Sequence, residues 1–480
     1  MIRVFSRIPS RLPSCLGTAL SHASLSLASL SLVSLAGASS AFAQDASARD
    51  ASARESAARG ASAESRALTA DERIARALAR KPKGLNCKPV NTGKRAHTDV
   101  NGHSPGLYIA SANLPRVAND WRTYACAKPD VRTLGANVIV PWSKIDSGRT
   151  AADGTPLLDW SFLDAAIAPW ARNGQKVNIL LWPSAQRTFQ HIDGEPATPA
   201  HVLERVPTVR CYRERRADRS WANITPDTPD AERRRDPEDV DVPLHWDATY
   251  QALYRPVIEQ FVRRYEGAPY VNYLRVGIGV GAESYAANGV PNAFGGCRDE
   301  WEAAGLTPER WTEHVLGMID FIGGLKPKSP FVITLNKFDG APDLPTQMAE
   351  LAVEKHGLGI GSQGGTARSI QQYRDPSESC YANWCTLFER YRDAGVPLEL
   401  QTPRQSDPGG ISGKGGAGQT GLVGALPEFL DFAMDRGATT FELYPFEWFV
   451  ATGNLPRWEA QKKDYNRALD RAAKRLAKKE

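Results

Sequence analysis

Three glutamates stand where strands of this sequence are expected to end, and their carboxyl groups are suited to acid–base and nucleophilic chemistry. Glu283 closes the run VGIGVGAESY, residues 276 to 285, in which Gly277, Gly279 and Gly281 alternate with apolar residues. Successive side chains of a strand point to opposite faces, so the glycines would leave one face bare and Glu283 would continue that face. The sequence therefore predicts an acid that points into a cavity. The alternative is a close strand-to-helix contact in which Glu283 caps the next helix.

Glu399 and Glu442 are the candidate partners of this acid. Glu399 lies in PLELQTP, residues 397 to 403, and Glu442 lies in TTFELYPFEW, residues 439 to 448. Glu399 and Gln401 are two residues apart and share a face, so we expect Glu399 to lie one layer deeper than Gln401. Glu442 has the better depth along its strand. For each carboxylate the alternative is a buried ion pair with a basic residue such as Lys144 or Arg404, because buried charges require partners.

Aromatic and amide side chains are expected around the same strand ends. Cleavage of a glycosidic bond needs one acid that protonates the leaving oxygen and one carboxylate that attacks or stabilises the oxocarbenium-like centre. Tryptophan faces stack on sugar rings, while amides and tyrosines bind hydroxyl groups. Helix packing is an equal alternative for Trp448. The predicted binding residues are Trp142, Lys144, Trp182, Tyr285, Asn336, Gln363, Gln401, Tyr444 and Trp448.

Eight apolar segments are expected to be the strands that carry these residues, and amphipathic helical segments separate most of them. Several of the helical segments end in glycine, which favours a helix C-cap. Eight strand–helix repeats with right-handed crossovers predict a parallel (β/α)8 TIM barrel, and a doubly wound open sheet is the alternative. The predicted strands are residues 106–114, 136–145, 176–185, 273–283, 331–338, 358–365, 397–403 and 439–448, and the predicted helices are 159–174, 248–267, 307–324, 346–357, 383–395 and 426–437.

A long insertion follows the third predicted strand. Residues 186–246 are polar, proline-rich and heavily charged. Loops that follow barrel strands lie on the catalytic face, so this insertion is expected to form one wall of a cleft. Cys211 within it and Cys297 after the fourth strand form one possible disulfide pair.

The first part of the chain is expected to lie outside the barrel. Residues 1–43 have three arginines, an apolar stretch and the sequence Ala41-Phe42-Ala43, which together predict a signal peptide and a periplasmic or secreted protein. Residues 44–80 are dominated by Ala, Ser, Arg and Glu, which predicts a disordered linker. Residues 81–480 are then one catalytic domain. The six cysteines after the leader favour disulfides, with Cys380 and Cys385 as the preferred local pair.

Composition excludes several other classes of protein. The formal net charge of +5 includes the three arginines of the leader, and the remaining +2 argues against a nucleic-acid partner. The apolar region of the leader is interrupted by serine and histidine, which argues against a membrane span. The histidines lack metal-ligand spacing, so neither a metal nor another cofactor is expected. The glycine-rich loop at 408–421 lacks the P-loop spacing and is expected to be a mobile lid. The oligomeric state is left open.

The chain resembles clan-A glycoside hydrolases, especially the β-galactosidase-like barrels of secreted bacterial proteins. The resemblance is carried by VIVPWSKID, by LLDWSFLDAAIAPWARNGQKVNILLW, by residues 242 to 284 and by FELYPFEW, and it covers roughly residues 106–450. It implies that Glu283 is the general acid/base and that Glu399, at the strand 7 position, is the nucleophile, with Glu442 as the substitute. The family usually has Asn before its strand 4 acid, whereas this chain has Ala282, so Asn336 or Gln401 would have to bind the 2-hydroxyl.

Two functional hypotheses follow from these residues. The first is an exported glycoside hydrolase that acts on a polysaccharide or oligosaccharide with retention, for which the two carboxyl groups should lie about 5 to 5.5 Å apart. The second is a non-catalytic carbohydrate-binding barrel that assists the export or assembly of a surface polysaccharide. Ala282 and the early position of Glu399 in its strand favour the second hypothesis.

Overall fold

The computed structural model describes residues 102–113, 132–185, 196–216, 233–286, 298–363, 373, 384–402, 422–452 and 459–477. The predicted signal peptide and linker, the loop at 408–421, Arg404, and the cysteines at 297 and 380 lie outside these residues. The domain boundaries and both disulfide pairs therefore stay predictions. Among the described helices, none is long and apolar enough to cross a membrane.

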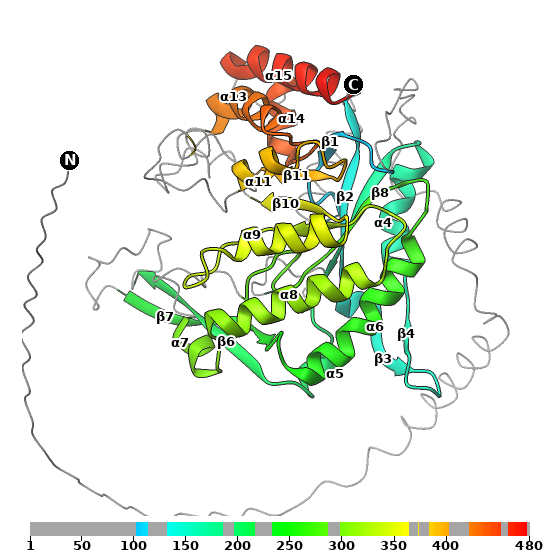
Figure 1. Ribbon diagram of the computed structural model, residues 1–480, viewed down its shortest axis with the longest axis vertical. Coiled ribbons are helices and arrows are strands. Elements are labelled where there is room, and N and C mark those ends of the chain that lie inside the picture. Colours follow the sequence, from blue (N-terminus) through cyan, green and yellow to red (C-terminus); the bar gives the residue numbers. More distant parts are fainter. Residues whose placement is uncertain are drawn as a thin grey trace, which may run out of the picture. The chain divides into compact units, whose positions relative to one another are not determined.

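Eight parallel strands form the centre of the molecule (Figure 1). Around the sheet each strand lies beside its predecessor among the eight, and the first strand pairs with the last, as Tyr108 does with Glu442. The strands are β1 (Gly106–Ile109), β2 (Thr133–Pro141), β5 (Lys176–Trp182), β8 (Val271–Val276), β9 (Val332–Thr334), β10 (Gly359–Gln363), β11 (Leu398–Gln401) and β12 (Thr440–Leu443).

One short contact closes the sheet between β8 and β9. Leu274 forms a parallel bridge with Phe331, and its N–H donates to the carbonyl of Pro330 at 2.9 Å. All eight strands thereby have two neighbours, which is the topology of a (β/α)8 barrel. The predicted TIM barrel is confirmed, and the open doubly wound sheet is excluded.

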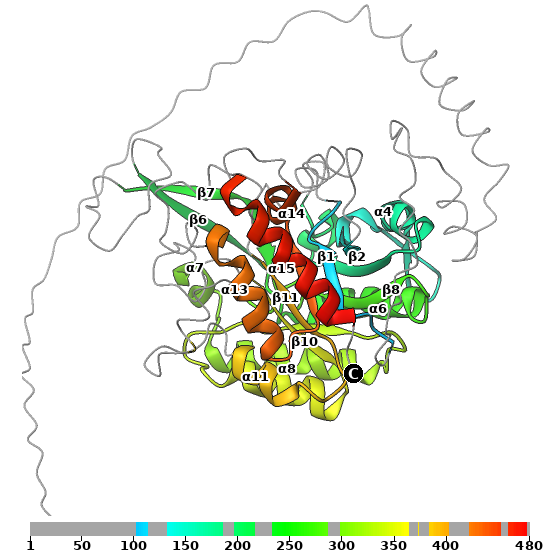
Figure 2. The ribbon, with the colours of Figure 1, turned by 90° about the horizontal axis from the view of Figure 1, so that it is seen from above.

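Helices follow the strands and cover the outside of the barrel. Two of them have capped first turns: Asp247 accepts from the N–H of Tyr250, and Thr307 accepts from that of Arg310. The α-helices are α4 (Ser161–Arg172), α5 (Ala200–Leu203), α6 (Ala248–Tyr265), α7 (Arg298–Ala303), α8 (Pro308–Gly324), α9 (Leu344–Ala349), α11 (Trp384–Tyr391), α13 (Leu422–Asp435), α14 (Pro445–Thr452) and α15 (Glu459–Ala477). A π-helical turn, η4 (Glu350–Lys355), extends α9, and α15 lies against α13 and α14 (Figure 2).

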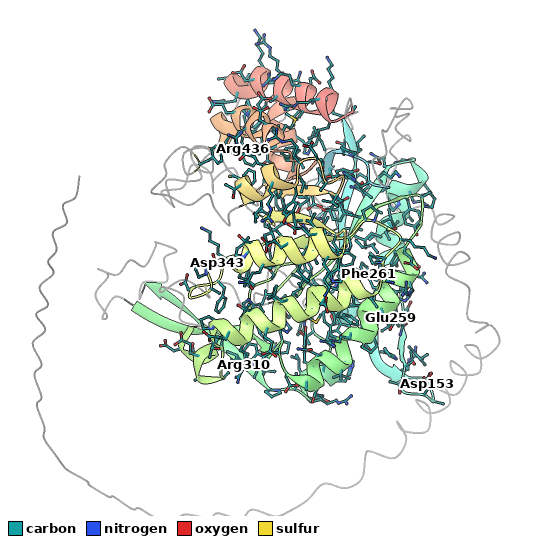
Figure 3. All side chains as sticks on the ribbon, in the orientation of Figure 1. Asp153, Glu259, Phe261, Arg310, Asp343 and Arg436 are labelled. Atoms are coloured by element: carbon teal, nitrogen blue, oxygen red, sulfur yellow. The ribbon has the colours of Figure 1, made fainter. Side chains whose placement is uncertain are left out.

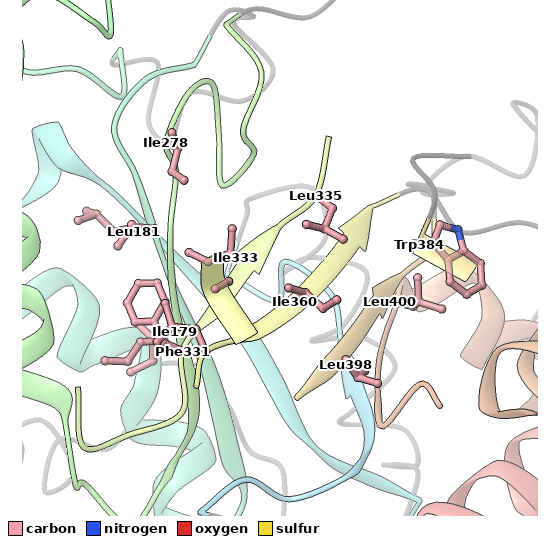
Figure 4. Packing of buried hydrophobic residues seen from close by; sticks show 14 of the residues in the cluster. Ile179, Leu181, Ile278, Phe331, Ile333, Leu335, Ile360, Trp384, Leu398 and Leu400 are labelled. Atoms are coloured by element: carbon pink, nitrogen blue, oxygen red, sulfur yellow. The ribbon is translucent and has the colours of Figure 1, made fainter. Parts of the chain in front are cut away.

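The main hydrophobic core lies between the strands and these helices. Alternate strand residues point outward into it, including Ile179, Leu181, Ile333 and Leu400 (Figure 4). The residues between them point into the barrel and include most of the polar ones. The strands are therefore apolar on the helix side, while their inner face is free to carry chemistry.

Two antiparallel hairpins interrupt the strand–helix order. β3 (Asp146–Thr150) and β4 (Pro156–Leu158) follow β2 and its 3-10 turn η1 (Trp142–Lys144), and Asp153 marks the hairpin turn in Figure 3. β6 (Thr208–Arg216) and β7 (Arg233–Pro243) lie in the predicted insertion after β5. The described part of the insertion is thus a short helix, α5, followed by a hairpin.

All eight strands end earlier than predicted, and the differences at β8 and β12 bear on the site. β8 ends at Val276, and the next residues turn back, with the N–H groups of Ile278 and Gly279 both donating to the carbonyl of Glu283. A Cβ on Gly277 would overlap the carbonyl of Gly281, so this glycine permits a close backbone approach and does not create the bare strand face that the sequence suggested. β12 ends at Leu443, after which α14 begins at Pro445.

Two glycine-to-alanine substitutions test the packing of the barrel. A Cβ on Gly135 of β2 would overlap the carbonyl of Lys176 on β5, so Gly135→Ala should lower the free energy of unfolding by about 1–3 kcal/mol. Gly317, in the middle of α8, has open space around it, so Gly317→Ala should raise that free energy by about 0.5–1 kcal/mol. Denaturant titration measures both, and a neutral Gly135→Ala would contradict the described β2–β5 register.

Candidate functional site

A polar network fills the inside of the barrel, and its centre is Arg275 on β8. The Arg275 side chain is 1% exposed. Its Nη1 donates to Oε2 of Glu399 on β11 at 2.8 Å, and its Nη2 lies 3.4 Å from Oε2 of Glu442 on β12. Both carboxylates have no exposed surface. The buried ion pair that the sequence allowed as an alternative is therefore present. Its basic partner is Arg275, and not Lys144 or Arg404 as the sequence suggested.

Glu442 accepts hydrogen bonds at both carboxylate oxygens. Oε1 accepts from Asn178 of β5 at 2.8 Å and from the hydroxyl of Tyr273 on β8. Oε2 accepts from Asn137 of β2 at 2.6 Å and from Gln401 at 3.3 Å, besides its contact with Arg275. So many donors hold the carboxylate in one orientation. No lone pair of Glu442 is evidently open to a ligand.

Glu399 is held on one side only. Its Oε2 accepts from Arg275 and, at 3.2 Å, from Gln363 of β10, whereas its buried Oε1 has no hydrogen-bond partner. Gly361 makes room for this carboxylate, because a Cβ there would overlap Oε2 of Glu399. Glu399 pairs in register with Gly361 and Gln401 with Gln363, so Glu399 lies one layer deeper than Gln401, as predicted.

Glu283 lies in the turn after β8, at the carboxyl ends of the strands. Asn336, which follows β9, fixes its surroundings: Oδ1 of Asn336 accepts from the N–H and the hydroxyl of Ser284 at 2.8 and 2.9 Å. The side chain of Asn336 also hydrogen-bonds the Glu283 carboxylate. The buried Oε2 of Glu283 has no hydrogen-bond partner. Like Glu399, Glu283 therefore combines one anchored side with one unpaired oxygen.

The pKa values of Glu283 and Glu399 are both raised. Burial raises the pKa of Glu283 to about 7, although Arg275 and the hydrogen bond from Asn336 both act to lower it. Burial also raises the pKa of Glu399, with the neighbouring charges of Glu442 and Glu283 adding to this effect and Arg275 opposing it. The mutual influence of Glu283, Glu399 and Arg275 shows that they belong to one electrostatic site.

Several predicted binding residues lie at this site. Trp182 and Tyr444 belong to the interior apolar cluster together with Ala282, and they are 8% and 7% exposed. Gln363 and Gln401 lie over the two buried carboxylates as hydrogen-bond donors, and Asn336 contacts Glu283. The buried Nε1 of Trp182 has no hydrogen-bond acceptor.

The other predicted binding residues are placed elsewhere. Trp142 is fully buried in the outer core, where it packs against Tyr254 and donates from Nε1 to Asp146 at 2.9 Å. Trp448 is fully buried on α14, so helix packing accounts for it. Tyr285 packs against the outer core, and Lys144 ends the η1 turn. Neither tryptophan presents a face on which a sugar could stack.

The most important residues that the sequence reasoning missed are Arg275, Tyr273, Asn137 and Asn178. Each stands in a largely apolar strand, and each side chain contacts the buried carboxylates inside the barrel. An available signal was the spacing of Tyr273 and Arg275, which are two residues apart in the strand that precedes Glu283.

Within the described ranges, no group of three or more His, Cys, Asp or Glu side chains could hold a metal ion.

Comparison with known proteins gives a fold likeness. Neither a protein-family model nor a curated protein matches this sequence. Among solved structures, endo-glycoceramidase II from Rhodococcus sp. is 13% identical with a TM-score of 0.38, and the match covers 73% of this chain and 75% of that one. A family 10 endo-β-1,4-xylanase from Gloeophyllum trabeum is 10% identical with a TM-score of 0.37 over 73% and 87%. The exo-β-1,4-mannosidase Op5Man5 from Opitutaceae bacterium strain TAV5 is 11% identical with a TM-score of 0.36 over 78% and 63%.

All three solved structures are glycoside hydrolases by their printed names, and their likeness to this chain is weak. The chemistry of this chain therefore has to be argued from its own side chains.

The ion-pair network gives the first prediction for the site. Arg275→Met should leave Glu399 and Glu442 without their countercharge and lower the free energy of unfolding at pH 8 by about 3–5 kcal/mol. The double variant Arg275→Met/Glu399→Gln should recover part of this loss because it removes one uncompensated charge. Urea titrations of the three proteins measure the difference. A single variant as stable as the wild type would contradict the role of Arg275.

The raised pKa of Glu283 gives the second prediction for the site. The folded state holds this proton up to about pH 7, whereas the ordinary pKa of a glutamate in an unfolded chain is 4.5. The stabilisation is therefore complete below about pH 4.5 and is lost as the pH rises through 7, a decrease of roughly 3 kcal/mol. Glu283→Gln should be more stable than the wild type at pH 8, with a flatter profile between these values.

Buried Glu447 serves as the internal comparison for that profile. Burial raises its pKa to about 8, so it contributes a slope of the same sign. Glu447→Gln should remove its own contribution, which runs from about pH 4.5 to about pH 8, and should leave the contribution of Glu283 in place. Identical profiles for the wild type and Glu283→Gln would show that Glu283 titrates normally.

Proposed function

We propose that this protein is an exported glycoside hydrolase that cleaves a polysaccharide or oligosaccharide with retention. Glu283 is the general acid/base, and Glu399 is the nucleophile. The observation that carries the proposal is a set of three buried polar atoms without partners in one site: Oε2 of Glu283, Oε1 of Glu399 and Nε1 of Trp182. Buried polar groups are normally hydrogen-bonded, so such atoms suit a ligand rich in hydroxyl groups.

The first chemical step uses the two carboxyl groups in different protonation states. Glu283, with a pKa of about 7, donates its proton to the glycosidic oxygen as the bond to the anomeric carbon breaks. Oε1 of Glu399 then forms an ester bond to that carbon. Positive charge that develops on the sugar ring favours the ionised form of Glu399, which offsets the effect of burial on its pKa.

The second step returns both groups to their starting states. Glu283, now a carboxylate, removes a proton from water, and the water oxygen attacks the anomeric carbon. The ester to Glu399 breaks, and the sugar is released with its original anomeric configuration. Arg275 holds Oε2 of Glu399 throughout, so only Oε1 takes part in the covalent bond.

Glu442 has a different role in this scheme. Its five hydrogen-bonding neighbours leave it no open position, so it is not the substitute nucleophile. It fixes Arg275, Tyr273 and Gln401 around the nucleophile.

A non-catalytic carbohydrate-binding barrel is the second candidate. It is favoured by the complete burial of Glu399 and by Ala282 in the place of the amide that the resembling family uses. In that case the unpaired oxygens of Glu283 and Glu399 accept hydroxyl groups and form no covalent bond. The two candidates differ in turnover, not in where the sugar lies.

Three matched variants test the proposal. Purified wild type is assayed against a panel of plant and bacterial polysaccharides, and the best substrate is used for Glu283→Gln, Glu399→Gln and the exposed control Glu309→Gln. We expect Glu283→Gln and Glu399→Gln to lower kcat by about 100-fold or more, because each removes a chemical step, and Glu309→Gln to leave kcat unchanged. Proton NMR of the first product should show the anomer of the substrate.

Binding measurements on the same proteins complete the test. Calorimetric titration should show that Glu283→Gln still binds the glycan. A wild type that binds the glycan without releasing any product would contradict the hydrolase and support the binding barrel. Release of the opposite anomer would contradict the nucleophilic role of Glu399.

A further inference from the structure

The turn that carries Glu283 is held by side chains from several parts of the fold. Residues 277–286 are in neither a helix nor a strand, yet five of their carbonyls accept from side-chain donors. These bonds are Tyr254 Oη to Gly277 at 3.2 Å, His314 Nε2 to Ile278 at 3.0 Å, Ser184 Oγ to Gly279 at 3.5 Å, Thr334 Oγ1 to Ala282 at 2.9 Å and Trp311 Nε1 to Ser284 at 3.2 Å. The acid is therefore placed by bonds to its backbone.

The bond from His314 differs from the others because its direction depends on a tautomer. His314 is buried on α8, and its ring packs against Trp311 with 5.1 Å between the centroids. A carbonyl oxygen only accepts, so the contact with Ile278 requires the proton on Nε2. The other nitrogen, Nδ1, must then carry a lone pair. Burial lowers the pKa of His314 to about 4, so the ring is neutral.

Two residues of α6 impose that tautomer. Nη2 of Arg255 donates to Oε1 of Gln251 at 2.7 Å, which fixes the orientation of the Gln251 amide. The Nε2 of Gln251 then faces Nδ1 of His314 at 3.3 Å as a donor. The guanidinium of Arg255 lies over the ring of Phe321, 5.0 Å from its centroid, and this contact holds the Arg255 side chain in place.

We propose that His314 is a positioning residue for Glu283, and that Arg255 and Gln251 hold it as the Nε2–H tautomer. The donors run in one direction, from Arg255 through Gln251 and His314 to the carbonyl of Ile278. The N–H of Ile278 donates in turn to the carbonyl of Glu283 at 3.0 Å. The chain thus ends one hydrogen bond away from the acid. We call this chain of hydrogen bonds, from Arg255 to the carbonyl of Ile278, the relay. The catalytic meaning of the inference rests on the proposed role of Glu283, whereas the existence of the relay does not depend on that role.

Two substitutions of His314 distinguish the loss of its Nε2–H donor from the loss of its ring. The amide nitrogen of glutamine reaches the position of Nε2, whereas that of asparagine reaches only the position of Nδ1. His314→Gln should therefore keep the bond to Ile278, and His314→Asn should lose it. When the bond is lost, the turn loosens and water reaches Glu283, so its pKa should fall from about 7 toward the ordinary 4.5.

Carboxyl-carbon NMR of protein with labelled glutamate measures this shift, with Glu283→Gln used to assign the signal. We expect the wild type and His314→Gln to titrate alike and His314→Asn to titrate at lower pH. Gln251→Ala, a milder change on the partly buried face of α6, should move the titration in the same direction, whereas the exposed Glu259→Ala on the same helix should not. Equal titration of Glu283 in all these proteins would overturn the proposal.

Labelled histidine and turnover give two further readouts. The ring-nitrogen signals of His314 should show a protonated Nε2 and an unprotonated Nδ1, and the reverse pattern would also overturn the proposal. If the protein hydrolyses a glycan, the alkaline limb of kcat/KM should shift to lower pH in His314→Asn and stay in place in His314→Gln. A protein without turnover would refute the proposed function, while the two NMR readouts would still decide the relay.

Discussion

The guanidinium of Arg275 is the charge on which the inside of this barrel depends. Two carboxylates without exposed surface, Glu399 and Glu442, approach each other at the centre of a parallel sheet. Without a counterion, such a pair would remain neutral by taking up protons or would destabilise the fold. Arg275 touches both, with donor–acceptor distances of 2.8 and 3.4 Å. Its own pKa is raised because the neighbouring Tyr273, Glu399 and Glu442 outweigh the opposing effect of burial.

This constraint divides the acids by role. Glu442, with both oxygens occupied, belongs to the scaffold that holds Arg275. Glu399 is anchored at one oxygen and open at the other. Glu283 lies in the turn after β8, at the carboxyl ends of the strands. Burial raises its pKa, and Arg275 partly opposes this shift. Glu399, anchored by a guanidinium, and Glu283, anchored by an amide, thus stand in different environments.

The sequence predicted the barrel well because its evidence is local. Apolar alternation marks each strand, and Gly and capping residues mark the helix ends. Some of the predicted site residues contact one another: Gln363 contacts Glu399, and Asn336 contacts Glu283. Their meeting follows from the rule that the carboxyl ends of barrel strands converge.

The remaining features depend on contacts that no local pattern carries. Trp142 and Trp448 follow strands as sugar platforms would, but packing with distant helices buries them. Arg275, inside an apolar strand, finds its partners 124 and 167 residues away along the chain. The glycines before Glu283 were correctly singled out for the wrong reason, since their function is to let the backbone fold back on itself.

Covalent trapping tests the central claim most directly. A 2-deoxy-2-fluoroglycosyl fluoride slows both steps but has a good leaving group, so a retaining enzyme accumulates the glycosyl ester on its nucleophile. After incubation with the gluco, manno and galacto reagents, peptide mass spectrometry locates the added sugar. We predict a single label on Glu399 with one of the three reagents, and none when Glu399→Gln is treated in the same way. A label on Glu442 would contradict the account of how Arg275 divides the two carboxylates.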